Sequence, residues 1–435
     1  MKRLLPLAAL IFLNTGAFAA GFDDLAIGAS DIGAAAEDLR PTAADPEPAE
    51  ELPSWDDYFA RLEPEMSPGG LSAASLNRLD LLVDGDEVMA AAVADIRNAV
   101  KFIHIEVFHW QPDETGFRMR DLLAERVRGG VQVRVILDQY GSALMPWSGK
   151  AKELVRSMRE AGIDVRIRGF EPLHLDHRKV MVMDDGAGGL TAYTGGMNIG
   201  DDYQRGWHDQ QTRVAGPAIT SLHRSFLDAW SELTGEKLEG FPEPQEAAGG
   251  KYTRVIAHTG GNADRNIKKA YLLAIGAARK SIRIENPYFT DKDVINALIA
   301  AASDQRRPGL KVQLIVPART DMPVTLRGFR SHYPAMLKAG VEVYEYQPRM
   351  AHLKVAVMDG LWSTVGSSNL DDMSLKHNDE MNLLVLDEAF AAELESRIFE
   401  KDIAQSLRVT DYNFNIIDSI SGQLPFRTAE AGTAP

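Results

Sequence analysis

The chain has 435 residues, 45% hydrophobic and 25% charged, a composition ordinary for a globular protein and a length sufficient for two lobes. Its formal net charge of -15 argues against a dedicated nucleic-acid binder. Because the chain contains no cysteine, disulfides, thiolate metal sites and a cysteine nucleophile are excluded.

The first twenty residues have the layout of a signal peptide. Lys2 and Arg3 precede an apolar run over residues 4 to 13, and residues 17 to 19 read Ala-Phe-Ala, a typical cleavage signal. The apolar run is too short to span a bilayer, although an uncleaved anchor or a buried helix remains an alternative. We therefore expect export to a bacterial periplasm.

Residues 21 to 70 are expected to form an acidic linker. They are rich in alanine and proline, and most of the chain's excess negative charge lies there, a composition typical of disorder. Residues 55 to 62 are compatible with a short docking helix.

From residue 71 the chain alternates predicted helices and strands, in the same order twice. In the first half, residues 71 to 245, we expect helices at 86–100, 119–128, 151–161 and 218–233, and strands at 102–108, 131–138 and 165–167. In the second half, residues 246 to 410, we expect helices at 267–278, 294–302, 326–339 and 389–406, and strands at 281–285, 311–317 and 342–346. The pattern predicts an α/β fold of two similar lobes, each with a mixed sheet flanked by helices. The two halves would join in the Pro/Gly/Glu-rich stretch 241–250, and residues 411 to 435 would form a tail.

One constellation of polar residues occurs once in each half. Each copy reads His-x-Lys, four apolar residues and Asp, then a glycine and an asparagine, and a carboxylate eleven residues beyond the asparagine. The first copy consists of His177, Lys179, Asp184, Asn198 and Asp209, and the second of His352, Lys354, Asp359, Asn369 and Glu380. A lone His-x-Lys is typical of a solvated strand end, but this repetition predicts two halves of one active site.

The residue types indicate chemistry on an anionic oxygen. Four apolar residues predict a buried strand, on which the histidine and the lysine of each copy point to the same face. The lysine can bind an anion, and the imidazole can attack or donate a proton. No metal or other cofactor is expected, since the histidines lack ligand spacing and the two lysines would repel a cation.

At these residues the sequence resembles the phospholipase D superfamily, and more narrowly its cardiolipin-synthase-like branch, over about residues 76 to 408. The second copy follows the pattern His-x-Lys-x4-Asp-x6-Gly-Ser-x-Asn throughout. The first copy departs from it, because ten residues separate Asp184 from Gly195 and because Gly196 replaces the serine; this Gly-Gly form is similar to cardiolipin synthases. Met373 stands where those enzymes have an arginine, so the resemblance does not extend to a phosphate contact from that arginine.

The resemblance implies transfer of a phosphatidyl group through a covalent phosphohistidine. His177 would be the nucleophile and His352 the acid and base, the lysines and asparagines would hold phosphoryl oxygens, and Asp209 and Glu380 would fix the imidazole tautomers. Asp184 and Asp359 would tie strands to loops. The substrate would be a phospholipid at a membrane surface, with an alcohol such as phosphatidylglycerol, or water, as acceptor. No nucleic acid is expected as a partner, and a monomer would suffice because one chain supplies both halves of the site.

Three alternatives remain open at this level. A hydrolytic phospholipase D would share every residue of the site. A nuclease of the same superfamily and a membrane-surface binding protein with a relic site are the others. A matched pair of glutamates, Glu106 and Glu285, also recurs across the halves, with a structural role at least as well supported as a catalytic one. His208, beside Asp209, is expected to pack rather than react.

Overall fold

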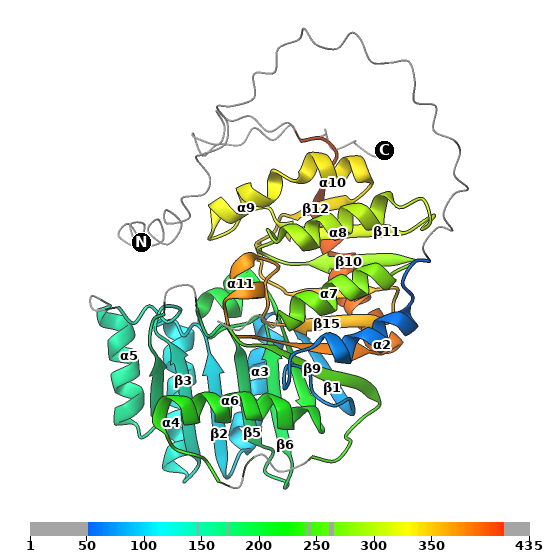
Figure 1. Ribbon diagram of the computed structural model, residues 1–435. Coiled ribbons are helices and arrows are strands. Elements are labelled where there is room, and N and C mark those ends of the chain that lie inside the picture. Colours follow the sequence, from blue (N-terminus) through cyan, green and yellow to red (C-terminus); the bar gives the residue numbers. More distant parts are fainter. Residues whose placement is uncertain are drawn as a thin grey trace, which may run out of the picture. The chain divides into compact units, whose positions relative to one another are not determined.

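A mixed sheet of fifteen strands runs through the described part of the chain, with helices on both faces (Figure 1). The structure, a computed structural model, describes residues 51–145, 148–171, 174–239, 241, 245–260 and 265–412. The predicted signal peptide, residues 21–50 of the predicted linker and residues 413–435 of the predicted tail lie outside these ranges. One unit begins at Pro53 and contains both lobes.

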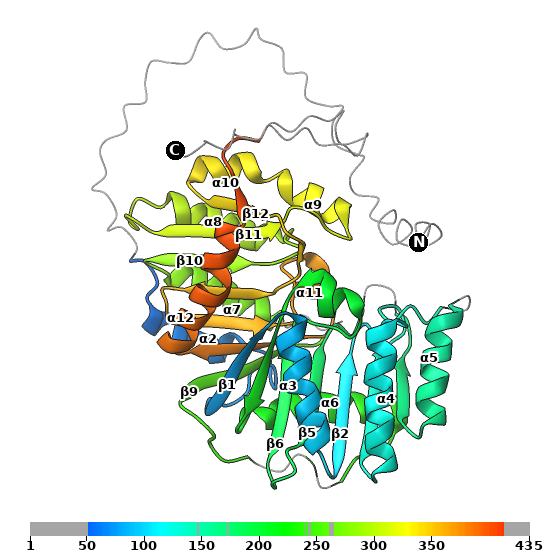
Figure 2. The same ribbon diagram turned by 180° about the vertical axis from the view of Figure 1, so that it is seen from behind.

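The first lobe contributes seven strands to this sheet, in the order β1-β8-β6-β5-β2-β3-β4. They are β1 (Ser75–Val83), β2 (Phe102–Val107), β3 (Gln132–Asp138), β4 (Asp164–Arg168), β5 (Lys179–Asp184), β6 (Leu190–Gly195) and β8 (Gln210–Ala215). The helices are α3 (Asp84–Asn98), α4 (Glu114–Arg128), α5 (Gly149–Glu160) and α6 (Ala218–Thr234), with a π-turn η1 (Asp202–Gly206). Helix α6 crosses one face of the sheet, and α3 and α4 cover the other (Figures 1 and 2).

The second lobe repeats the arrangement in the order β9-β16-β15-β14-β10-β11-β12-β17. Its strands are β9 (Lys251–His258), β10 (Ser281–Glu285), β11 (Lys311–Pro317), β12 (Glu342–Tyr346), β14 (Val355–Met358), β15 (Trp362–Gly366), β16 (Glu380–Leu386) and β17 (Ser406–Val409). Its helices are α7 (Asn266–Ala277), α8 (Lys292–Ser303), α9 (Pro323–Arg330), α10 (Tyr333–Ala339), α11 (Asp372–Lys376), α12 (Glu388–Leu394) and α13 (Glu400–Ala404), with a π-turn η2 (Glu395–Phe399). Helices α7 and α8 cover one face, and α12 lies on the other (Figures 1 and 2).

The α/β architecture with a repeated lobe is confirmed, but the two sheets are continuous. Strand β1 pairs with β8 on one side and with β9 on the other, so it joins the lobes edge to edge. One hydrophobic cluster also contains buried residues of both lobes, among them Leu81 and Val180 from the first and Val355 and Leu383 from the second. The lobes therefore share a core as well as a sheet.

Two predicted helices of the second lobe differ in detail from the prediction. The helix expected at 326–339 divides into α9 and α10, because Pro334 has no N–H to continue a helix and is tolerated only in the first turn of α10. The helix expected at 389–406 is continuous from Glu388 to Ala404, with one π-turn, η2, between α12 and α13, and it ends before Ser406, where the edge strand β17 begins.

A helix precedes the first strand, inside the segment predicted as linker. Helix α2 (Trp55–Glu65) begins at a capping box of Ser54 and Asp57, and it buries Tyr58 and Leu62. It packs beside α7 of the second lobe. The hypothesis of a docking helix is confirmed, and the folded unit begins before residue 71 because this apolar stripe is buried.

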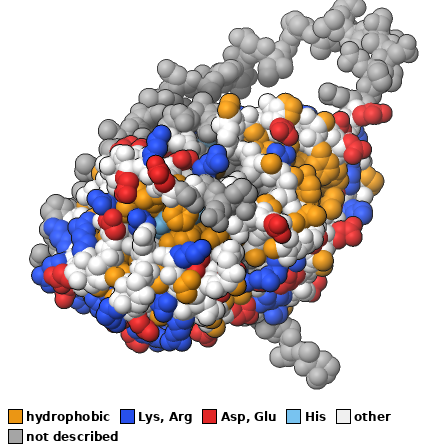
Figure 3. Space-filling view, turned by 90° about the horizontal axis from the view of Figure 1, so that it is seen from below, with side chains coloured by type: hydrophobic (Ala, Val, Ile, Leu, Met, Phe, Trp, Pro, Cys, Tyr) orange, Lys and Arg blue, Asp and Glu red, His pale blue; other side chains and the backbone are white. Residues whose placement is uncertain are grey.

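No helix among the described residues is long and apolar enough to cross a membrane. On the face drawn in Figure 3, hydrophobic side chains gather in separate areas, with basic and acidic side chains interspersed around them.

Candidate active site

The two motif histidines are held by backbone hydrogen bonds that cross between the lobes. The N–H of His177 donates to the carbonyl of Asp379 at 3.0 Å, and the N–H of His352 donates to the carbonyl of His208 at 2.7 Å. Short parallel bridges flank both bonds, one between Asp176 and Asp379 and one between β13 (Met350–Ala351) and β7 (Trp207–His208). The sequence pattern predicts both histidines on strands. In the structure their amides bond across the lobes instead, and His177 and His352 lie just before β5 and β14.

The side chains cross in the same way. Nδ1 of His177 lies 2.8 Å from Oε1 of Glu380, and Nδ1 of His352 lies 2.7 Å from Oδ2 of Asp209. Each carboxylate therefore orients the histidine of the opposite lobe. A carboxylate on Nδ1 fixes the proton there and leaves Nε2 for the substrate.

The two lysines lie beside the histidines of their own copies. Nζ of Lys354 is 3.0 Å from Nε2 of His352 and also donates to its carbonyl, while Nζ of Lys179 donates to the carbonyl of His177. Both lysines are buried, and burial lowers their pKa, to about 7 for Lys179 and about 8 for Lys354. Around neutral pH each lysine is therefore only partly protonated, and an arriving anion would favour the protonated, charged form.

The asparagines of the two copies, Asn198 and Asn369, are both buried. Oδ1 of Asn198 accepts from the N–H of His109 at 3.0 Å, which orients the amide group of that side chain. Oδ1 of Asn369 is buried and accepts no hydrogen bond within the described residues. A buried amide with open hydrogen-bonding capacity is suited to a polar ligand.

The two carboxylates differ in their surroundings. Burial raises the pKa of Asp209 to about 7. Burial also opposes ionisation of Glu380. The pKa of Glu380 is nevertheless lowered, because His177 interacts with it electrostatically and through a hydrogen bond and because Lys179 adds positive charge. The hydroxyl of Ser367 adds a hydrogen bond to Oε2 of Glu380 at 2.5 Å. Glu380 is therefore the more firmly ionised of the two.

In the first copy, Gly196 occupies the position of Ser367, and the structure shows why a serine does not fit there. A Cβ on Gly196 would lie 2.3 Å from Oδ1 of Asp209 and 3.2 Å from its Cγ. The glycine thus leaves the space that the shorter carboxylate side chain occupies. Two of the differences between the copies, glycine for serine and aspartate for glutamate, therefore concern the same space.

Both imidazoles have a lowered pKa, principally because they are buried. For His352 the charge of Lys354 lowers the pKa further, whereas for His177 the charge of Glu380 partly opposes the effect of burial. Both rings are neutral at neutral pH. No described residue hydrogen-bonds to Nε2 of His177, so the lone pair of this nitrogen is available. Nε2 of His352, in contrast, accepts a hydrogen bond from Nζ of Lys354.

The motif aspartates lie at the other ends of the strands and have structural contacts. Asp184 accepts from the backbone amides of residues 100–102, and Asp359 accepts from those of residues 279–281. Asp359 also accepts from the indole N–H of Trp55 on α2 at 3.0 Å. Each aspartate ties a motif strand to the loop before the neighbouring strand, β2 or β10.

Aromatic rings surround the histidines, and all of them lie outside the repeated motif. Ring centroids lie 4.8 to 6.1 Å from an imidazole: Phe108 from His177, and Trp207, Tyr203 and Tyr288 from His352. They bury the imidazoles and restrict the access of water.

Comparisons with known proteins agree with this geometry. A family model described as "Cardiolipin synthase, PLD-like domain" matches residues 92–230 and again 271–403. A protein named probable cardiolipin synthase from Bacillus subtilis is 31% identical over 357 residues, which cover 78% of this chain and 68% of that protein. The cardiolipin synthase of Geobacillus kaustophilus is 33% identical over 328 residues, which cover 69% of this chain and 61% of that protein. The chain thus spans roughly two thirds of the length of these relatives.

Among solved structures, the phosphatidylserine synthase of Haemophilus influenzae has a similar fold. The superposition gives a TM-score of 0.60 at 14% sequence identity and covers 82% of this chain and 92% of that one.

The two family-model matches fall one in each lobe, so the duplication seen in the sequence is a duplication of this domain. The chain belongs to the phospholipase D superfamily and, within it, to the cardiolipin-synthase-like branch.

Proposed function

We propose that the chain is a phosphatidyltransferase that makes cardiolipin from phosphatidylglycerol through a covalent phosphohistidine. The observation that carries this proposal is the crossed pairing of His177 with Glu380 and of His352 with Asp209. It gives two oriented imidazoles, one from each lobe, with two lysines beside them. Nucleophile, proton donor and positive charge are the three requirements of phosphodiester exchange.

In the first step, Nε2 of His177 attacks phosphorus and the bond from phosphorus to the glycerol oxygen breaks. The departing glycerol oxygen takes a proton from His352. His352 is neutral in the empty site, but a bound phosphodiester anion raises its pKa and draws Lys354 toward the phosphoryl oxygens. The free lone pair on His177 supports its assignment as nucleophile.

In the second step, His352 takes the proton from the acceptor hydroxyl, whose oxygen attacks phosphorus as the nitrogen–phosphorus bond breaks. If the acceptor is a second phosphatidylglycerol, the product is cardiolipin; if it is water, the product is phosphatidic acid. Burial of both histidines, 7% and 3% exposed, and the aromatic rings around them favour an alcohol, because free entry of water would hydrolyse the intermediate.

The test is incubation of the purified chain with vesicles of radiolabelled phosphatidylglycerol. We expect cardiolipin and one free glycerol per cardiolipin, with none formed by His177→Ala or His352→Ala. His332→Ala, a histidine outside the site, is the matched control and should retain activity. Phosphatidic acid as the main product would favour the hydrolase, and cleavage of plasmid DNA without added metal would favour the nuclease.

Export to the periplasm is part of the proposal and follows from the sequence of residues 1–20. N-terminal sequencing of the protein from a periplasmic fraction should give a chain that starts near residue 20. Full-length protein in the cytoplasmic fraction would contradict it.

A further inference from the structure

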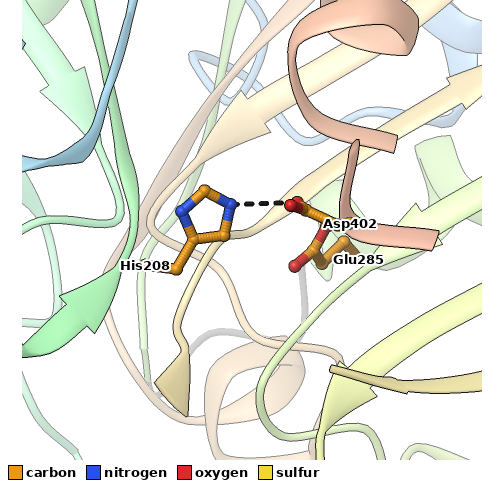
Figure 4. A group of neighbouring side chains, drawn as sticks. All are labelled: His208, Glu285 and Asp402. Carbon is orange, nitrogen blue, oxygen red and sulfur yellow. Dashed lines mark hydrogen bonds and ion pairs between the residues drawn. The ribbon is translucent and has the colours of Figure 1, made fainter. Parts of the chain in front are cut away.

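A second buried group of ionisable side chains lies where the two lobes meet, next to Asp209 in the chain. His208 comes from β7 of the first lobe, whereas Glu285 ends β10 and Asp402 lies on α13 of the second. One ligand atom from each lies within 4.8 Å of the others, and the three side chains are buried. In Figure 4 the imidazole faces both carboxyl groups.

The imidazole of His208 is fixed by a carboxylate on its other side. Nδ1 lies 2.7 Å from Oδ1 of Asp84, which is also paired with Arg349. Nε2 points to Oδ2 of Asp402 at 2.9 Å. A carboxylate behind a histidine whose second nitrogen faces acidic side chains is the arrangement that orients histidine ligands of metal ions.

Glu285 supplies an independent observation. It is 1% exposed, and neither of its carboxylate oxygens accepts a hydrogen bond from any described donor. Its counterpart in the first lobe, Glu106, lies 3.0 Å from the guanidinium of Arg178. In the second copy of the motif, Leu353 occupies the position of Arg178. Glu285 therefore lacks the arginine that pairs with Glu106 in the first lobe.

The charges of this group do not balance without a ligand. Asp84 and Arg349 cancel, and a protonated His208 balances only one of the carboxylates Asp402 and Glu285. Burying an unbalanced carboxylate is unfavourable, so the second one requires either a proton or a cation. A divalent cation bound to neutral His208 would balance both carboxylates.

We propose that His208, Glu285 and Asp402 bind a divalent cation that joins the two lobes behind the active site. One imidazole nitrogen and two carboxylates suit zinc or manganese better than calcium or magnesium, which prefer oxygen ligands alone. A cavity of about 230 Å³ reaches two of the three side chains, His208 and Asp402, and is also lined by Arg349, Arg397 and Lys401. The ion takes no part in the reaction, so this inference goes beyond the proposed function.

The experiment measures metal content and thermal stability of the whole chain. The protein is stripped with a chelator and dialysed against zinc or manganese chloride, and the bound metal is counted by plasma mass spectrometry. We expect about one ion per chain, as expected for one site, and a rise in melting temperature with added metal. Glu285→Gln, which keeps the side-chain shape, should lose both effects. Glu106→Gln, the matched substitution in the first lobe, should keep both.

Cobalt substitution gives a readout that needs no variant. Cobalt(II) bound by one imidazole and carboxylates should give visible absorption bands that excess zinc removes. Wild-type protein that binds no metal above the buffer level overturns the proposal. Metal binding that is unchanged in Glu285→Gln also overturns it. If that variant is in addition more stable than the wild type, a proton shared between Glu285 and Asp402 explains how the two carboxylates are buried together. Cardiolipin synthesis is scored separately, so failure of either proposal is recognised by itself.

Discussion

Introducing serine at Gly196 should uncouple His352 from its carboxylate. The new Cβ would stand 2.3 Å from Oδ1 of Asp209, about 1 Å inside an ordinary contact. Asp209 cannot retreat without loss, because Oδ1 accepts from the N–H of Gln210 at 2.8 Å and Oδ2 holds His352 at 2.7 Å. Loss of one hydrogen bond to a charged group costs about 1.5–3 kcal/mol, so kcat for Gly196→Ser should fall about 10- to 100-fold.

The assay is cardiolipin formation at saturating phosphatidylglycerol, with far-ultraviolet circular dichroism to verify folding. Gly149→Ser is the matched control, because a Cβ at Gly149 meets nothing within 4 Å. The double variant Gly196→Ser/Asp209→Glu reproduces the serine–glutamate pair of the second copy and should recover part of the loss. Full activity in Gly196→Ser would refute the assigned role of Asp209. A folded double variant no better than the single one would refute the coupling of the two positions.

Three further predictions concern the His352 tautomer, the charge of the two lysines and a buried contact of helix α2. Asp209→Asn should lower kcat about 10³- to 10⁴-fold by removing control of the His352 tautomer, whereas it should not change the rate at which the His352→Ala variant releases p-nitrophenol from an activated phosphatidyl ester; a slower release would show that Asp209 acts elsewhere. The two lysines of the site have pKa values of about 7 and 8 and lose their charge as the pH rises through that range, so KM should increase above about pH 8; a KM constant from pH 6 to 9 would contradict this. Tyr58→Phe leaves the buried indole N–H of Trp362 without its acceptor and should lower the free energy of unfolding by about 1–3 kcal/mol in urea titrations, whereas Phe59→Leu, at a side chain 41% exposed, should not.

The sequence predicts much of the fold because its local signals are strong. Apolar periodicity and flanking glycines or prolines predict helices such as α4 and α6 and strands such as β3 and β11 to within a few residues of one end or both. The sequence does not predict strand β1, because its pairing with both β8 and β9 follows from contacts between residues far apart in the chain. A single sequence carries no signal for such pairings.

The site shows the same division. Repetition identified the histidines, lysines, asparagines and carboxylates, and the structural interpretation of Asp184 and Asp359 agrees with their backbone contacts. It did not show that Glu380 serves the first histidine and Asp209 the second, because the offset of eleven residues is identical in both copies. The roles in catalysis stay predictions until they are measured.

The most direct test uses a phosphatidyl ester of p-nitrophenol, a leaving group that needs no proton donor. Single-turnover mixing with His352→Ala should release about one p-nitrophenol per chain in a burst, and peptide mass analysis should place the phosphatidyl adduct on His177. His177→Ala should give neither burst nor adduct. An adduct on another residue, or a burst that survives loss of His177, would contradict the account.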